Sequence, residues 1–344
     1  MSSSLFSHQA ERAHQAALRS IARSVEDSAA PQAAAVARDG IAALLRAGSV
    51  LCVTGAGVST DSGIPDYRGP QGSLRRHRPM TYQEFRYDPA ARRRYWARSF
   101  VGWRRLGEAA PNRAHELLAH WHLRGTLGGL VTQNVDGLHR EALQTAGERS
   151  LPAAGTSSSG VMAGENRPRG ERGFPAAGTS TVELHGNLST VICLQCGGRE
   201  DRSHMDVRLE EANPGYAEAA AAAAENVNPD GDVTLDESWV QRFRMVSCLS
   251  CGSEELKPDV VYFGENVPAE RKAAVEALEA EASALLVVGS SMAVMSGYSI
   301  ALRMHRAGKP IAVINGGPSR ADAKAQWRWR ARITPALEEL DALL

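Results

Sequence analysis

The segment SVLCVTGAG, residues 49–57, decides which fold this sequence can adopt. It holds a short apolar run, Val50 to Val53, that leads directly into the turn Thr54-Gly55-Ala56-Gly57. A continuous apolar run that stops at glycines is typical of a buried strand followed by a tight turn. The same pattern, a strand that ends in a small or polar loop, occurs three more times, at residues 127–131, 284–288 and 310–314.

Stretches with helical periodicity fill the intervals around these strands, at residues 8–25, 33–47, 268–282 and 298–307. Because the strands are apolar throughout and do not alternate, we expect a parallel sheet with both faces covered. The predicted fold class is therefore α/β, a Rossmann-like doubly wound parallel sheet with a second, smaller domain. In such sheets ligands bind at the carboxyl ends of the strands, so the four loops are expected to line one crevice.

The composition is that of a globular protein of about two domains. The chain has 344 residues, of which 43% are hydrophobic and 23% charged, and its 39 basic residues balance its 39 acidic residues. A neutral chain is not expected to bind nucleic acid directly or to bind an anionic membrane. No apolar run approaches the length of a membrane-spanning helix, so no membrane partner is expected.

The first residues of the chain lack the apolar core of a secretory signal. They are amphipathic and contain Ser, Ala and Arg, which is a weak feature of mitochondrial transit peptides, but Glu11, Glu26 and Asp27 argue against one. A surface helix packed on the domain is the favoured interpretation. Together with cysteines that suit a reducing compartment, this favours the bacterial cytoplasm, with a mitochondrial matrix as the second choice.

The loop after the first strand has residues that suit a phosphate-containing ligand. Gly55 and Gly57 permit a tight turn in which backbone N–H groups approach a pyrophosphate, although a plain strand–helix turn explains them equally well. Asp66, Tyr67 and Arg68 follow on the same loop, and the guanidinium of an arginine there can hold phosphate or ribose oxygens. A solvated turn is the alternative.

Two Cys-x-x-Cys-Gly segments, one at Cys193 and Cys196 and the other at Cys248 and Cys251, predict a metal site. Four thiolates in two such turns match tetrahedral zinc, and a site with four protein ligands leaves no position open for water. We therefore expect one structural Zn²⁺ rather than a redox pair or an iron–sulfur cluster. Cys52 lies within a strand and is expected to be a small core residue.

His185, in the segment ELHG at residues 183–186, is a candidate general base. It lies beside a glycine at the junction of two predicted modules, and a histidine is the side chain best suited to take a proton near neutral pH. A purely structural histidine is the alternative. The stretch 147–180 that precedes it is rich in Gly, Pro, Ala, Ser and Thr, and the hexapeptide PAAGTS occurs there twice. We expect a mobile, exposed loop.

The ordered motifs of the chain resemble those of the sirtuin family over roughly residues 45–340. They are GAGVSTDSGIPDYRG (55–69), TQNVDGLH (132–139), ELHG (183–186), the two cysteine pairs, KPDVVYFGE (257–265), GSS (289–291) and NGG (315–317). The segments RYWARSFVGW (94–103), PDGDV (229–233) and SGY (296–298) are similar to class II, close to its mitochondrial lipoamidase and ADP-ribosyltransferase branch. The long 147–180 stretch departs from the family pattern, and a tolerated surface insertion is the favoured explanation.

The resemblance implies a division of the chain and an NAD site. The expected parts are an N-terminal helical segment (1–45), an NAD-binding domain in two parts (46–146 and 257–344), the loop (147–180) and a zinc-binding domain (181–256). The residues expected to bind NAD are Gly55, Ala56, Gly57, Ile64, Asp66, Tyr67, Arg68, Gln133, Asn134, Val135, Asp136, Gly289, Ser290, Ser291, Asn315, Gly316, Gly317 and Ile333.

The resemblance also implies an NAD-dependent protein lysine deacylase that releases nicotinamide and O-acyl-ADP-ribose. The acyl oxygen attacks the ribose carbon as nicotinamide departs, and His185 then takes a proton from the ribose, with Asn134 and Asp136 as the other catalytic residues. An acyl-lysine protein or peptide is expected to bind between the domains as an added strand. The residues expected along that strand are Val260, Val261, Phe263, Gly264 and Glu265.

Three other functions compete with deacylation. A protein mono-ADP-ribosyltransferase would use the same site with a different acceptor. A zinc-ribbon binding module without catalysis does not account for His185, Asn134 and Asp136 together. A redox dehydrogenase does not account for the cysteine pairs, and Thr60 replaces the third glycine of its usual fingerprint.

Overall fold

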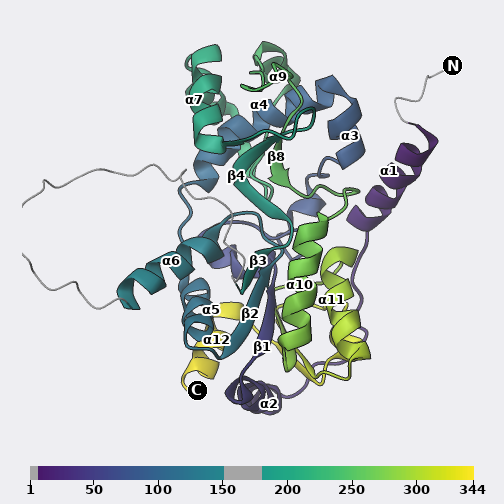
Figure 1. Cartoon of the computed structure of the whole chain (residues 1–344), viewed down its shortest axis with the longest axis vertical. Coiled ribbons are helices and arrows are strands. Elements are labelled where there is room, and N and C mark those ends of the chain that lie inside the picture. Colours follow the sequence, from purple (N-terminus) through teal and green to yellow (C-terminus); the bar gives the residue numbers. More distant parts are fainter. Residues whose placement is uncertain (1–6, 151–179) are drawn as a thin grey trace, which may run out of the picture.

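The computed structural model describes residues 7–150 and 180–344 of the chain (Figure 1). Residues 151–179 of the predicted 147–180 loop lie outside the described residues. The first residues of that stretch belong to α6 (Leu138–Ser150). Within the described part of the chain, no helix combines the length and the apolar character that a membrane crossing requires.

Six parallel strands form the central sheet in the order β11-β10-β9-β1-β2-β3. Chain order reverses at β1, so the strand ends beside it form the crevice expected for a doubly wound sheet. The strands are β1 (Val50–Thr54), β2 (Leu127–Thr132), β3 (Thr181–Glu183), β9 (Ala284–Val288), β10 (Ile311–Asn315) and β11 (Trp327–Arg330). The four apolar runs correspond to β1, β2, β9 and β10, which confirms the predicted fold class.

Helices cover both faces of this sheet, which explains why its inner strands are apolar throughout. Val50 and Cys52 of β1 face α2 (Ala34–Ala47), α5 (Arg113–Leu123) and α12 (Ile333–Asp341). Leu51 and Val53 face α10 (Ala269–Glu281) and α11 (Met295–Arg306) on the other side. Cys52 is fully buried, and burial raises the pKa of its thiol, so it is the core residue that its position predicts.

The two outer strands, β3 and β11, were not predicted from the sequence. β3 has only three residues, which is too short for a periodic signal. β11 has the sequence WRWR and is mostly half-buried, so it lacks the continuous apolar character of the inner strands. Trp327 of β11 lies where a side chain on Gly40 of α2 would stand, which shows how closely this edge strand is covered.

A second, smaller body lies above the carboxyl ends of the central strands (Figure 1). Its sheet is antiparallel, in the order β5-β4-β8, and β6 and β7 form a separate pair. The strands are β4 (Gly186–Cys193), β5 (Arg199–Asp201), β6 (Glu225–Val227), β7 (Val233–Thr234) and β8 (Leu256–Val260). The helices are α3 (Tyr82–Tyr87), α4 (Pro89–Leu106), α7 (Arg202–Ala212), α8 (Tyr216–Ala223) and α9 (Glu237–Arg242).

Strand pairing crosses two of the predicted domain boundaries. β3 begins at Thr181 but pairs with β2 in the large sheet, and β8 continues past residue 257 but pairs with β4 in the small sheet. Helix α4, which precedes both boundaries, packs its aromatic residues into the core of the small body, where Trp96 donates its indole N–H to the Leu256 carbonyl at 2.8 Å. The small body is therefore built from two segments of chain.

The N-terminal helix α1 (His8–Ile21) is shorter than the predicted 8–25. Ser7 is its N-cap residue, and the Ser7 hydroxyl accepts the Ala10 N–H. It ends where Arg68 donates to the carbonyl of Ser20 at 3.1 Å and to that of Ile21 at 3.5 Å. A cation that binds the last carbonyls of a helix satisfies them and favours its end there. α1 is thus a helix packed on the domain, as the sequence favoured.

The small body depends on a buried cation, Arg202 of α7, whose side chain is 0% exposed. It donates to Asp206 Oδ1 at 2.8 Å and to the Ser99 carbonyl at 3.1 Å, and its guanidinium lies 4.8 Å from the Trp96 ring centroid. We expect Arg202→Ala to lower the free energy of unfolding by about 3–5 kcal/mol, because it leaves Asp206 buried without its partner.

Urea denaturation of the zinc-loaded protein measures this loss. The matched control is the double variant Arg202→Met with Asp206→Leu, which removes both charges and keeps the apolar volume. It should be more stable than Arg202→Ala. Equal stability of the two variants would show that the unpaired carboxylate is not the cause.

Candidate active site and metal centre

A single large cleft runs along the carboxyl ends of β1, β2, β9 and β10, beneath the small body. Its volume is about 1340 Å³, which is ample for a dinucleotide with part of a second ligand. All of the residues predicted to bind NAD line it, as do His185, Asn134 and Asp136. The structure thus brings the predicted site residues together in one cleft.

The turn after β1 packs directly on the loop after β9. Gly55 donates its N–H to the Val288 carbonyl at 3.1 Å, and Gly57 donates to the Gly289 carbonyl at 2.9 Å. A Cβ on Gly57 would lie 2.9 Å from that same carbonyl oxygen, and Gly289 itself has a φ of +62°. Only glycine fits such a close approach of two backbones. The absence of side chains leaves a cradle that suits a pyrophosphate.

Three polar side chains form a chain of hydrogen bonds at the centre of the cleft. Asn134 Nδ2 donates to Ser59 Oγ at 2.9 Å, and Ser59 Oγ donates to Asp136 Oδ2 at 2.7 Å. The other carboxylate oxygen of Asp136 accepts the N–H of Leu138 at 3.0 Å, at the start of α6. Burial raises the pKa of Asp136, although these donors oppose the rise. The arrangement offers a fixed, partly desolvated acceptor for an amide group.

His185 lies between β3 and β4 with its ring in the cleft. Its Nδ1 is 2.9 Å from the carbonyl oxygen of Gln133, and its Nε2 is 2.8 Å from Ser296 Oγ. A carbonyl only accepts, so Nδ1 carries the proton and Nε2 is the basic nitrogen. Burial is the main cause that lowers the pKa of His185, to about 4. The ring is therefore neutral at pH 7 and able to accept a proton.

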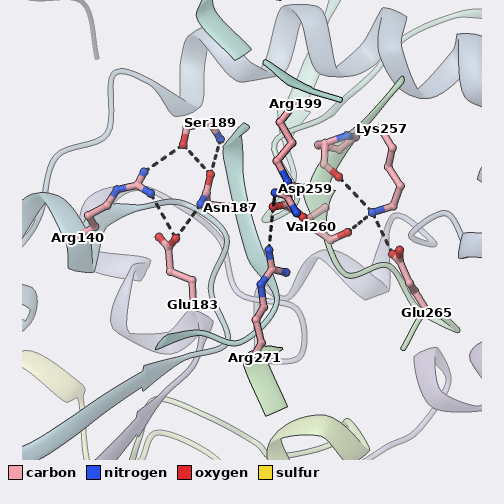
Figure 2. A network of polar contacts seen from close by, with 11 residues as sticks. Arg140, Glu183, Asn187, Ser189, Arg199, Lys257, Asp259, Val260, Glu265 and Arg271 are labelled. Carbon is pink, nitrogen blue, oxygen red and sulfur yellow. Dashed lines mark hydrogen bonds and ion pairs between the residues drawn. The ribbon is translucent and has the colours of Figure 1, made fainter. Parts of the chain in front are cut away.

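Charged side chains, of which Asp259 and Arg271 are buried, form a network around the junction between His185 and Gly186. Figure 2 shows the members of this network. Arg271 of α10 and Arg199 of β5 both donate to Asp259 Oδ2, so the large and the small body share one carboxylate. A Cβ on Gly186 would lie 1.9 Å from the Asp259 carbonyl oxygen. On the other side of the junction, Glu183 accepts from Arg140 at 3.3 Å and from Asn187 at 2.8 Å. His185 is therefore held from both bodies.

Arg68 lines the cleft, but its guanidinium donates to carbonyls at the end of α1. These donors of Arg68 are therefore already bonded within the protein and do not point freely into the cleft. The carboxylate of Asp66 likewise accepts the N–H of Gly69 at 2.8 Å within its own loop. Tyr67 is packed edge-to-face on Phe263, and burial raises the pKa of its hydroxyl.

Of the residues predicted to contact an acyl-lysine peptide, four line the cleft, and they are Val261, Phe263, Gly264 and Glu265. Val260 does not line it, because it is the last residue of β8 and its side chain packs in the core of the small body. Two backbone hydrogen bonds hold the segment in place. The His185 carbonyl accepts the Val261 N–H at 2.8 Å, and the Tyr82 N–H donates to the Phe263 carbonyl at 2.9 Å.

Sequence reasoning missed several residues of the cleft. The end of α1, including Ser20 and Ile21, forms part of its wall, and so do Met292 and Ser296 beyond β9. No periodicity or motif marks the α1 residues as site residues, because their role arises from the packing of a distant helix. Ser296 was noted only as part of the segment SGY and not for its contact with His185.

The four cysteines fit a tetrahedral metal ion. Their sulfur atoms all lie within 4.8 Å of one another, and two Sγ–Sγ pairs, Cys193–Cys251 and Cys196–Cys248, are each 3.7 Å apart. A tetrahedron with Zn–S bonds of about 2.3 Å has edges of about 3.8 Å. The two turns are equivalent, since Gly197 and Gly252 both have a φ of +73°. These residues are therefore positioned to bind one structural Zn²⁺.

A second group of potential ligands, His77, Asp230 and Asp232, has ligand atoms within 4.8 Å of one another. Arg98 Nη1 lies 3.8 Å from Asp232 Oδ2, at the same distance as His77 Nε2. The Arg98 guanidinium thus lies beside the Asp232 carboxylate, where a metal cation would otherwise bind. The group is thus an internal ion cluster.

Comparisons with known proteins agree with this geometry. The model of the Sir2 family matches residues 55–151 and 175–296, and the interruption falls inside the predicted 147–180 loop. A relative from Corynebacterium efficiens, named NAD-dependent protein deacetylase 1, is 54% identical over 89% of this chain and 98% of its own length. A relative of the same name from Streptomyces coelicolor is 47% identical over 86% of each chain.

Solved structures share the fold at lower identity. One described as showing the basis for the mechanism and regulation of Sir2 enzymes aligns with a TM-score of 0.60 at 23% identity, over 90% of this chain and 98% of that one. Another, of Sir2Tm bound to a propionylated peptide, aligns with a TM-score of 0.59 at 22% identity, over 88% of this chain and 97% of that one.

Removal of the metal should destabilise the protein. We expect one zinc per chain by elemental analysis, and we expect chelation or Cys251→Ser to lower the melting temperature, because the small body then loses the cross-link between its two cysteine turns. Cys52→Ala is the control, since Cys52 lies in the large sheet, and it should keep full zinc content. Full zinc content in Cys251→Ser would contradict a four-cysteine site.

Stability should also fall in acid. Burial lowers the pKa of His115 and His185 to about 4 and that of His139 well below its usual value. The unfolded chain takes up these protons near pH 6.5, so stability is lost as the pH falls from about 6.5 toward 4. Each histidine lowers the free energy of unfolding by up to about 1.4 kcal/mol per pH unit in this window.

Urea denaturation of the zinc-loaded protein at pH 7, 6 and 5 measures the slope. His139→Gln should flatten it by about one proton, whereas His8→Gln, at an exposed position, should not. A free energy of unfolding that is constant from pH 7 to 5 would contradict buried neutral histidines.

Proposed function

The chain belongs to the Sir2 family, and on that premise we propose that it is an NAD-dependent protein lysine deacylase. The observation that carries this function is His185, a neutral imidazole whose basic Nε2 faces a cleft large enough for a dinucleotide. The deacetylases similar to this chain match it over nearly its whole length, and they support the same activity.

The β1 turn and the loops after β9 and β10 would hold NAD. Gly55, Ala56 and Gly57 approach without large side chains, so a pyrophosphate can reach the backbone there. Gly289, Ser290, Asn315, Gly316 and Ile333 line the same wall of the cleft and would surround the adenosine. When bound, NAD supplies a ribose carbon from which nicotinamide can leave.

Asn134 and Asp136 would orient the nicotinamide amide. The Ser59 hydroxyl holds both side chains, so they present a fixed set of donors and acceptors. Ile64 lines the cleft beside them and excludes water from that side. Preorganised polar groups of this kind lower the energetic cost of reorientation during the reaction.

The acyl-lysine would enter between the two bodies along Val261–Glu265. There its acyl oxygen could reach the ribose carbon of bound NAD, and Nε2 of His185 would receive the proton of a ribose hydroxyl. The Gln133 carbonyl keeps the ring in the tautomer that can do this. One water molecule is consumed when the lysine amine is released, and the products are free lysine, nicotinamide and O-acyl-ADP-ribose.

Mono-ADP-ribosyl transfer is not favoured, because relatives that are 43–54% identical to this chain carry the name of deacetylases. We propose that the enzyme works in a reducing compartment, as the four thiolates of the metal site suit, and the bacterial cytoplasm stays a prediction. The class II branch also stays a prediction.

Incubation with NAD and acetyl-, succinyl-, long-chain acyl- and lipoyl-lysine peptides tests the activity by mass spectrometry. We expect equal amounts of nicotinamide and O-acyl-ADP-ribose from at least one peptide. His185→Ala should lose acyl-ADP-ribose formation by about 100-fold or more, because general-base catalysis contributes about 10²–10⁴-fold.

His204→Ala, at an exposed position in the small body, is the control and should keep the activity. Protein labelled with ADP-ribose, without any acyl-ADP-ribose, would instead support the transferase. No release of nicotinamide from the folded, zinc-loaded protein would overturn the catalytic proposal.

A further inference from the structure

The basic nitrogen of His185 is not free in the cleft. Nδ1 donates to the Gln133 carbonyl, so the lone pair of a neutral ring is at Nε2. Ser296 Oγ lies 2.8 Å from that nitrogen. Because Nε2 has no hydrogen, the hydroxyl must be the donor in this bond. The only lone pair that can take a proton is therefore occupied by the proton of Ser296.

Ser296 is held in this place by the fold. It is the second residue of α11, and its backbone carbonyl accepts the Ser299 hydroxyl at 3.0 Å. The next residue, Gly297, packs on Gln133 so closely that a Cβ would lie 2.4 Å from the Gln133 side-chain oxygen. Gln133 thus fixes His185 through its backbone and the first turn of α11 through its side chain.

Ser296 also lines the cleft on the side of the NAD loops. A hydroxyl has one proton to donate and two lone pairs that accept. With its proton on Nε2, Ser296 Oγ still has a lone pair for a further donor in the cleft. This is the property that a proton relay requires, and it explains how a histidine with both nitrogens bonded can act as a base.

We propose that Ser296 is a catalytic relay residue that carries the ribose proton to His185. The ribose O–H bond breaks as a new Oγ–H bond forms on Ser296, while the original Oγ–H bond breaks and an Nε2–H bond forms. One proton moves in net terms from the ribose to His185, and the serine is unchanged. This inference rests on the proposed deacylase function.

The first measurement needs no NAD. In protein labelled with ¹⁵N-histidine, His185 should show a protonated Nδ1 and a hydrogen-bonded Nε2, assigned with His185→Gln. Ser296→Ala should move the Nε2 resonance toward that of an imidazole nitrogen without a donor, and Ser296→Thr should restore it. An Nε2 resonance that Ser296→Ala leaves unchanged would overturn the proposal.

The second measurement separates the two chemical steps. Departure of nicotinamide precedes the action of His185, so Ser296→Ala should keep peptide-dependent exchange of labelled nicotinamide into NAD within about twofold. It should lose acyl-ADP-ribose formation by about 100-fold or more, at the lower end of general acid–base effects. Ser296→Thr should recover most of the loss. Ser203→Ala, at the same helix position in α7 and outside the cleft lining, is the matched control.

The third measurement uses the unaltered enzyme, so it does not depend on how well a variant folds. Under conditions where acyl-ADP-ribose formation is rate-limiting, its rate is measured in mixtures of H₂O and D₂O. A plot of this rate against the deuterium fraction of the solvent should be curved, because two protons move together. A linear dependence would overturn the relay. Full acyl-ADP-ribose formation by Ser296→Ala would also overturn it and would show that the ribose meets Nε2 directly.

The failure of the deacylase function has a different signature. If the wild-type protein shows no exchange of nicotinamide with any acyl-lysine peptide, the function itself fails and the relay fails with it. If the wild type exchanges nicotinamide normally and Ser296→Ala forms acyl-ADP-ribose at the wild-type rate, the deacylase function stands and the relay alone is wrong.

Discussion

The close contact between the β1 turn and the loop after β9 is the constraint on which the site depends. Gly57 donates to the Gly289 carbonyl at 2.9 Å, and a side chain on Gly289 would lie 2.7 Å from the Val58 nitrogen. With the two turns held together, Gln133 at the end of β2 reaches both, through the Thr54 carbonyl at 3.2 Å and the Ser290 hydroxyl at 2.8 Å. The carbonyl of the same Gln133 then orients His185. A contact between two glycine turns therefore determines where the His185 ring points.

The features that could be predicted from the sequence are those with a local signal. Inner strands that are buried on both faces have continuous apolar runs, and two matched cysteine pairs have the spacing of metal ligands. The short strand β3 and the WRWR strand β11 have no such signal, because they owe their place to neighbouring strands. The packing of α4 on the small body also could not be predicted from local sequence patterns. Its buried Trp96 bonds to Leu256, which lies 160 positions further along the chain.

The candidate site divides in the same way. Strand-end loops of a parallel sheet must meet, so the strand pattern predicted one shared crevice. The individual NAD residues were named from the family resemblance, and all of them line that cleft. The sequence did not predict which side chains from distant parts of the chain contact these residues. Arg68 has the residue type of an anion ligand, but its donors meet the last carbonyls of α1. Ser296 is unremarkable as a residue type, and only its 2.8 Å distance to His185 gives it a chemical role.

The metal site and His185 are linked by one strand. β4 begins at Gly186, directly after His185, and ends at Cys193, the first of the four cysteines. Its partner β8 begins five residues after Cys251 and ends beside His185, where the Val261 N–H meets the His185 carbonyl. Arg199 and Arg271 then fix the Asp259 carboxylate from either body. Buried charges of this kind are costly unless each is paired, so the junction has few alternative arrangements. A structural ion held by the four cysteines can thus maintain the position of His185 through the strands that it anchors.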